Sequence, residues 1–171
     1  MNPITSGVIL LGELSLWVAT LMAAWSATVS FAGAAQGRRD LVVSGERATY
    51  ATFGFVVLAS IGLWTALFAH DFSIKFVASY TSANLPKIYT FTAFWAGQSG
   101  SLLFWGLILT LYGALAAWFG RGERTRHFMP YVNGTMGVIS LFFLLTMAFG
   151  ANPYERLDWV PPDGRGMNPQ L

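Results

Sequence analysis

Long apolar segments alternate with shorter polar ones along this chain, and that alternation predicts its fold. Four segments are almost entirely apolar, covering roughly residues 6–35, 49–69, 99–119 and 131–150. A helix of about 20 apolar residues crosses the roughly 30 Å hydrocarbon core of a bilayer. We therefore predict an all-α, polytopic membrane helix bundle with four transmembrane helices.

Composition supports a membrane protein over a soluble enzyme. Of 171 residues, 54% are hydrophobic and 11% are charged, whereas about 25% of the residues in a soluble domain are charged. The net charge of +2 is too small to suggest nucleic acid as a partner, and the absence of cysteine excludes disulfides and thiolate chemistry. The first apolar segment is too long for a cleaved signal sequence and is interpreted as a retained span.

The distribution of Lys and Arg predicts the orientation of the bundle. In a four-span chain the first and third connections share a side, and the second connection shares the other side with both termini. Six arginines fall on the first side: Arg38, Arg39, Arg47, Arg121, Arg124 and Arg126. The other side has four basic residues over about twice the length: Lys75, Lys87, Arg156 and Arg165. The positive-inside rule therefore places the arginine-rich side in the cytoplasm and both termini outside.

Small residues form stripes on two of the predicted spans. The first stripe is Ala19, Ala23 and Ala27, and the second is Gly106, Thr110, Gly113 and Ala117. Such stripes let helix backbones approach closely in lipid. They predict helix–helix packing, either within this chain or with further helices.

The second connection, residues 70–98, is long and half apolar, with many aromatic residues. This composition favours a short amphipathic helix in the outer membrane interface. Such a helix could be a purely structural cover over the bundle, or a platform for a partner or a lipid-borne ligand.

Few residues are candidates for chemistry. His70 and His127 are the only histidines and are expected on opposite sides of the membrane, so they cannot form one metal site. His70, beside Asp71, could be an axial ligand or a proton carrier, although capping of a helix end is the commoner role. Glu13 lies in the first apolar segment, where a carboxylate is a functional candidate unless it reaches the headgroup layer. We identify no catalytic residue and no metal site.

The segment Trp95-Ala-Gly-Gln-Ser-Gly-Ser-Leu-Leu-Phe-Trp105 combines two tryptophans with small and polar residues at the entrance to the third span. A simple membrane anchor needs only one interfacial aromatic residue before its apolar run. The mixture suits docking of a planar amphipathic ligand or of another helix. After the fourth span, residues 151–171 are rich in turn-forming Pro, Gly, Asn and Asp, which predicts bends rather than a helix. The chain ends within this tail, which suggests a piece of a larger or separately encoded protein.

Three ordered motifs resemble the N-terminal part of the CcmF/NrfE family of cytochrome c maturation proteins. The first is Asp71-Phe-Ser with Val77-Ala-Ser-Tyr-Thr-Ser-Ala-Asn-Leu-Pro. The second is the 95–105 segment, similar to the family pattern W-x-G-[HQ]-x-G-S-L-L-x-W, which often has Glu where this chain has Ser99. The third is Asn152-Pro-Tyr-Glu-Arg-Leu with Pro161-Pro-Asp-Gly-Arg-Gly-Met-Asn-Pro-Gln-Leu, resembling N-P-F-x-R and P-P-x-D-G-x-x-L-N-P-x-L-Q.

The resemblance implies a part in a haem lyase complex, which attaches haem to apocytochrome c in the bacterial inner membrane or its mitochondrial equivalent. It implies a CcmE-type haem chaperone, a CcmH-type apocytochrome-presenting partner, apocytochrome c and the remainder of a CcmF-like protein as partners. Haem would be the cofactor of the complete protein or complex. The two histidines match none of the family's haem ligands, so this chain alone is not expected to bind haem stoichiometrically or to be catalytic.

The resemblance also implies candidate site residues and an organisation of the chain. Five residues of the second motif are candidates for the environment of haem or a partner: Trp95, Gln98, Gly100, Ser101 and Trp105. Six tail residues carry the family signature: Asn152, Pro153, Asp163, Gly164, Asn168 and Pro169. We expect a four-span membrane domain over residues 1–150 with the outer loop 70–98, followed by a periplasmic tail over residues 151–171.

The sequence is also compatible with two other functions. A transport or channel subunit would need polar residues stacked through several spans. A purely structural membrane subunit of a larger complex would need only the packing faces described above.

Overall fold

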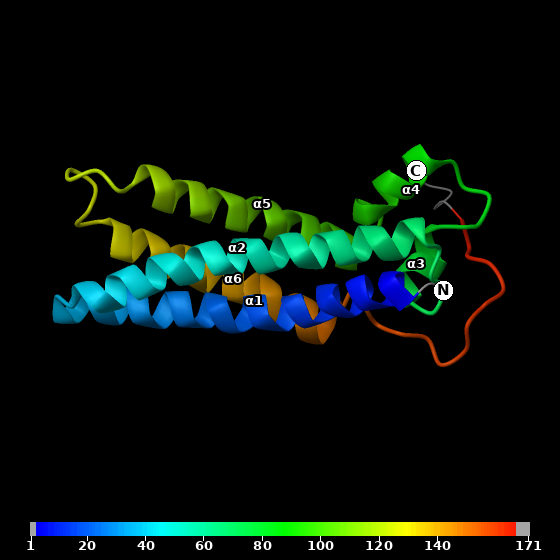
Figure 1. Cartoon of the computed structure of the whole chain (residues 1–171), viewed down its shortest axis with the longest axis horizontal. Helices are drawn as coiled ribbons and strands as arrows, with labels where there is room; N and C mark the ends of the chain where they lie inside the picture. Colours follow the sequence, from blue (N-terminus) through cyan, green and yellow to red (C-terminus); the bar gives the residue numbers. More distant parts are fainter. Residues whose placement is uncertain (1–2, 167–171) are drawn as a thin grey trace.

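Four long helices form an antiparallel bundle in the computed structural model, which describes residues 3–166 (Figure 1). They are α1 (Pro3–Gln36), α2 (Arg39–Phe68), α5 (Gln98–Phe119) and α6 (Met129–Gly150). Each of the four is long and apolar enough to cross a membrane. No strand occurs in the described part of the chain, so the prediction of an all-α membrane bundle with four spans is confirmed.

The connections between the long helices lie at two opposite ends of the bundle (Figure 1). The connections α1–α2 and α5–α6 lie together at one end, which we call the arginine end because it carries the six arginines named above. The second connection and the tail lie together at the opposite end, which we call the tail end. The first and third connections therefore share a side, as predicted.

The first connection is shorter than its polar sequence suggested. The second helix begins at Arg39 rather than near residue 49, and only Gly37 and Arg38 separate it from α1. Gly37 has a φ of +64°, a left-handed conformation that costs glycine little and permits the tight reversal. The polar residues from Arg39 to Arg47 are thus helical, and α2 continues beyond its apolar part at the arginine end.

Two short helices and one 3-10 turn take the place of the single interfacial helix predicted in the second connection. They are α3 (Lys75–Tyr80), α4 (Lys87–Thr92) and η1 (Ala93–Trp95). In α3, Phe76, Val77 and Ala78 are buried, whereas α4 exposes its apolar side chains, with Ile88 65% exposed. Only α4 therefore presents the apolar surface expected of an interfacial helix.

Small residues make the closest helix contacts, as their spacing predicted. Ala19 and Ala23 are fully buried in α1, and a Cβ added to Gly137 in α6 would come within 2.7 Å of the Ala27 backbone nitrogen. In α5, Gly106, Thr110, Gly113 and Ala117 are all buried. These stripes are packing faces inside this bundle.

Buried hydroxyl groups in the spans are mostly satisfied within the helices. Thr52 donates to the Ala48 carbonyl over 2.9 Å, and Ser60 donates to the Val56 carbonyl over the same distance. The void among the buried hydroxyls at mid-bundle has a volume of only about 10 Å³, the lower limit for a single water molecule. The hydroxyl groups at mid-bundle therefore leave a void no larger than one water molecule at that point of the bundle.

Candidate functional site at the tail end of the bundle

A polar cleft of about 250 Å³ lies at the tail end, where three distant segments of the chain meet. The start of α5 contributes Gln98 and Ser99, and the end of α6 with the following residues contributes Gly150, Ala151, Asn152 and Glu155. The third wall is α3, with Lys75, Phe76, Ser79 and Tyr80. The structure thus brings parts of all three sequence motifs together at one site, which we call the tail-end cleft.

Two glycines of the 95–105 segment allow aromatic side chains to pack directly on its backbone. A Cβ at Gly97 would collide with the Tyr80 ring, and a Cβ at Gly100 would collide with the Phe94 carbonyl and come within 2.5 Å of the Phe76 ring. Both glycines are buried. They hold α3 and η1 against the start of α5, so Gly100, a candidate for ligand contact, has a packing role.

In the rest of this segment, Ser101 makes a structural hydrogen bond, whereas the two tryptophans are partly exposed. The Ser101 hydroxyl donates to the Trp95 carbonyl over 2.7 Å, and this bond ties η1 to α5. Trp95 is 39% exposed and packs against Phe91 and Phe104, at centroid distances of 5.8 and 5.7 Å. Trp105 is 58% exposed. Both rings therefore leave a surface available to lipid or to another helix.

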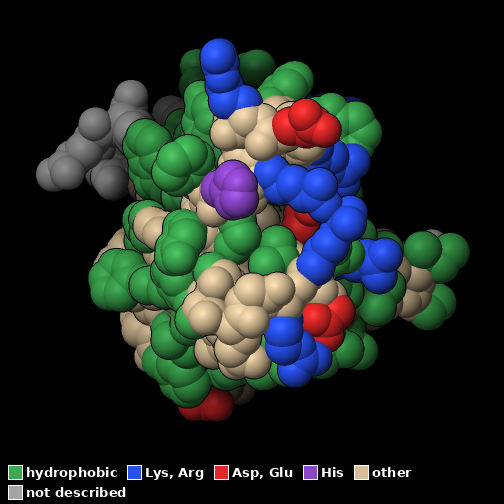
Figure 2. All heavy atoms as spheres, turned by 90° about the vertical axis from the view of Figure 1, so that its left-hand side faces the viewer, with side chains coloured by type: hydrophobic (Ala, Val, Ile, Leu, Met, Phe, Trp, Pro, Cys, Tyr) green, Lys and Arg blue, Asp and Glu red, His purple; other side chains and the backbone are tan. Residues whose placement is uncertain are grey.

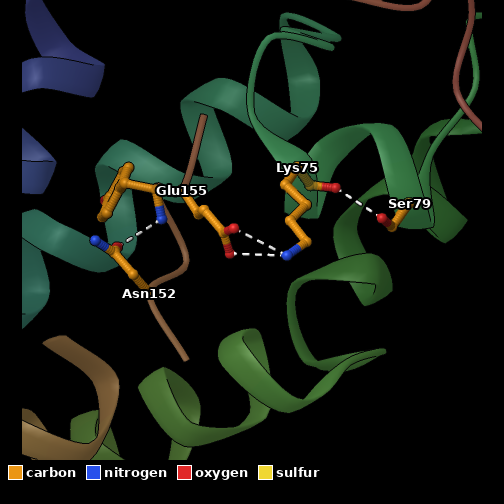
Figure 3. Close-up of polar contacts among 5 residues, drawn as sticks. Lys75, Ser79, Asn152 and Glu155 are labelled. Carbon is orange, nitrogen blue, oxygen red and sulfur yellow. Dashed lines mark hydrogen bonds and ion pairs between the residues drawn. The ribbon is translucent and has the colours of Figure 1, made fainter. Parts of the chain in front are cut away.

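An ion pair closes one side of the tail-end cleft (Figure 3). The Lys75 ammonium donates to both Glu155 carboxylate oxygens, at 2.9 and 3.0 Å, and the Lys75 backbone N–H donates to the Glu155 carbonyl. The Ser79 hydroxyl donates to the Lys75 carbonyl over 2.7 Å. Lys75 and Glu155 supply the charges of the cleft and balance each other, and Ser99 adds none. The cleft is therefore suited to hydrogen bonding rather than to attracting one sign of charge.

The start of the tail anchors itself in the bundle. The Asn152 side chain accepts a hydrogen bond from the Tyr154 backbone N–H at 2.9 Å, and this local turn directs the Tyr154 side chain inward. Pro153 is buried, and Tyr154 is only 2% exposed, with its hydroxyl donating to the Ala59 carbonyl of α2. Burial raises the pKa of the Tyr154 hydroxyl, so this group remains a neutral donor.

Sequence reasoning did not single out Tyr154, because a tyrosine next to a proline in a turn-rich tail is ordinarily exposed. A signal was nevertheless present in two helices. Gly12 in α1 and Gly62 in α2 approach so closely that a Cβ on Gly12 would lie 2.8 Å from the Gly62 Cα. Both glycines leave room for the Tyr154 hydroxyl, which would lie 2.7 Å from a Cβ on Gly62.

The later signature residues fasten the tail to α3. The Asp163 carboxylate accepts hydrogen bonds from the backbone N–H groups of Ala83 and Gly164, at 2.8 and 2.7 Å. Gly164 packs against the Thr81 carbonyl with no space for a side chain. These signature residues therefore support the loop around α3, while Asn168 and Pro169 lie outside the described residues.

The other candidates stay apart from this cleft. His70 lies two residues beyond the end of α2 and has a left-handed φ of +48°, and its Nδ1 is buried without a hydrogen-bond partner. Glu13 lies partly buried in α1, next to Gly12, and His127 is exposed at the arginine end. Within residues 3–166 no three His, Asp or Glu side chains are grouped closely enough to hold a metal ion.

Fold and site together define a polytopic membrane protein whose tail-end loops are fastened over a four-helix bundle, with a polar cleft between them. No protein-family model matches the chain. Over 162 residues, or 94% of the chain, it is 37% identical to the cytochrome c-type biogenesis protein ccl1 of Rhodobacter capsulatus and 35% identical to CcmF of Pseudomonas fluorescens. It is 33% identical over the same length to NrfE of Haemophilus influenzae.

A solved structure has the same arrangement of helices. The cytochrome c haem lyase CcmF superposes on 86% of the chain with a TM-score of 0.77 and 29% sequence identity. The chain belongs to the CcmF/NrfE family of cytochrome c-type biogenesis proteins and corresponds to the N-terminal part of its members. It spans about a quarter of the length of the relatives it matches.

Proposed function

We propose that this chain supplies the N-terminal scaffold of a cytochrome c haem lyase complex, with haem bound elsewhere in the complete protein or complex. The observation that carries the proposal is the match of 86% of the chain to a CcmF haem lyase at 29% identity. The chain holds the tail-end loops over the membrane through the buried Tyr154 side chain and the Lys75–Glu155 ion pair.

The tail-end cleft and the exposed faces of Trp95 and Trp105 form the surface for the remainder of the complex. Gln98 and Ser99 place an amide and a hydroxyl group on the lining of the cleft. Trp95 and Trp105 offer partly exposed apolar rings on the same segment of the chain. A partner helix or a haem-bearing segment would bury the rings and bond to the polar groups, as at an ordinary protein interface.

The proposal extends to partners and location. The partners are the remainder of a CcmF-like protein, a CcmH-type protein, a CcmE-type haem chaperone and apocytochrome c. The tail end faces the periplasm from the bacterial inner membrane, because the arginine-rich end is retained on the cytoplasmic side. In this arrangement, residues 1–150 form the membrane domain and residues 151–171 form a periplasmic tail.

Complementation tests the proposal. The gene is deleted in the source organism, and holocytochrome c is measured by haem staining of gels after the chain is restored. Restoration by the wild-type chain is expected, with loss of most holocytochrome when Gly97→Leu drives a side chain into the Tyr80 ring. Gly54→Leu is the control, since a Cβ there meets nothing within 4 Å. Undiminished holocytochrome c in the deletion strain would refute the proposal.

A further inference from the structure

A second, larger cleft lies at the arginine end, and the proposed haem lyase role does not use it. Its volume is about 480 Å³, against about 250 Å³ for the tail-end cleft. Four arginines from α2 and the α5–α6 connection line it: Arg39, Arg47, Arg121 and Arg126. Figure 2 views this end directly, and its basic side chains form a band along one side of the face.

The positive charge in this cleft is mostly uncompensated. Glu46 is the one acidic residue of the lining, which gives a net charge of +3 (4 − 1). The Glu46 carboxylate pairs with Arg121 at 2.9 Å, and the Arg121 guanidinium also lies over the rings of Tyr50 and Trp118, at 5.5 and 4.8 Å from their centroids. Arg121 is thereby held in place, while Arg39, Arg47 and Arg126 have no ion-pair partner among residues 3–166.

A buried polar group also opens into the cleft. Asn133 of α6 is 2% exposed and lines the cleft, and its Oδ1 has no hydrogen-bond partner. Burying an amide oxygen without a donor costs free energy. An ordered water or a hydroxyl group of a bound headgroup would supply that donor, whereas the phosphate itself would bond to the arginines. Arginines that served only to orient the protein in the membrane would not need to line one cleft together. They would also not need a buried amide without a partner beside them.

Aromatic residues next to the cleft fit a position at the level of lipid headgroups. Exposed aromatic residues flank it where α5 ends and α6 begins: Trp118 is 59% exposed, Phe119 is 79% exposed and Phe128 is 68% exposed. Aromatic side chains gather at the membrane–water interface. Guanidinium groups match phosphate oxygens with paired hydrogen bonds, and basic pockets between helices on the cytoplasmic side suit anionic headgroups.

We infer that this cleft binds the phosphate of an anionic phospholipid, with Arg39, Arg47 and Arg126 as the phosphate ligands and Arg121 fixed beside them by Glu46. The bound lipid fastens α2 to the α5–α6 connection. Lipid binding here does not depend on haem attachment, so a test of one does not decide the other.

Native mass spectrometry of the full chain in a zwitterionic detergent tests the inference. The fraction carrying one lipid is measured during titration with dioleoyl phosphatidylglycerol, and phosphatidylcholine serves as the neutral control. Each basic residue near an anionic lipid contributes about fivefold in affinity. The double variant Arg47→Gln with Arg126→Gln should therefore weaken phosphatidylglycerol binding by about 25-fold.

Two other arginines of the same end supply a charge-matched control. Arg38 and Arg124 do not line the cleft, and Arg38 is paired with Asp40, so Arg38→Gln with Arg124→Gln should leave the affinity within about twofold. Equal losses in the two double variants would overturn the inference, because they would indicate unspecific attraction. Equal binding of phosphatidylcholine would overturn it too. Release of the lipid by a few millimolar inorganic phosphate would reassign the cleft to a soluble phosphate ligand.

Discussion

Replacement of Tyr154 tests whether the tail is a structural part of the bundle. Tyr154 lies 2% exposed between α1 and α2, and its hydroxyl donates to the Ala59 carbonyl. Tyr154→Ala removes the ring from a packed site where the glycines at 12 and 62 cannot fill the space. We expect a loss of about 3–5 kcal/mol in unfolding free energy, as for other large-to-small changes of buried aromatic residues.

Tyr154→Phe separates the ring from its hydroxyl. The substitution keeps the packing and removes one donor, while the Ala59 carbonyl can still accept its bond within α2. The expected loss is about 0.5–1.5 kcal/mol, the net value of one hydrogen bond. Phe is also the residue in the family motif that this segment resembles, so the ring should account for most of the effect.

Equilibrium unfolding in mixed detergent–SDS micelles, followed by tryptophan fluorescence, measures these changes. Trp159→Ala in the same tail is the control, since Trp159 is 72% exposed and a surface change should stay within about 0.5 kcal/mol. The reasoning fails if Tyr154→Ala costs no more than Trp159→Ala, because the tail would then not be packed in the bundle. It also fails if the Phe variant loses as much as the Ala variant.

Three further predictions concern other parts of the molecule. Gly100→Ala should lower the free energy of unfolding by about 1–3 kcal/mol, because the added methyl group overpacks against Phe94. Gly54→Ala is the control: its Cβ meets open space, so it should be neutral or stabilise by up to about 1 kcal/mol. Thermal unfolding in detergent compares the two variants. Asp163→Ala removes the acceptor for two backbone N–H groups, so amide hydrogen exchange should rise around Ala83 and leave mid-bundle amides unchanged; unchanged exchange at Ala83 would contradict this. A reporter enzyme active only after export should be active when fused after Ala83 and silent when fused after Arg124, and the reverse pattern would invert the topology.

Much of the architecture is determined by the sequence alone, because membrane spans depend on a local property. Apolar runs of sufficient length must become helices in lipid, where each backbone polar group needs a partner within the chain. The four spans and the packing stripes at Ala19 and Gly106 were therefore predictable from composition and spacing. The clustering of arginines likewise predicted which connections share an end, and the motif at residues 95–105 indicated the family.

The start of α2 and the contacts of the loops and the tail depend on the tertiary structure, because local sequence patterns do not specify them. The start of α2 at Arg39 depends on the reversal at Gly37, and polar residues can continue a helix once it leaves the hydrocarbon. The sequence predicts Gly100 and Ser101 as candidates for a ligand or partner environment, and only the folded loop shows that Gly100 packs on Phe94 and that Ser101 bonds to Trp95. Tyr154 acquires its role only because α1 and α2 leave a space for it, 95 residues from its hydrogen-bond partner Ala59. Contacts between segments so far apart depend on how the helices pack, and no single stretch of sequence carries that information.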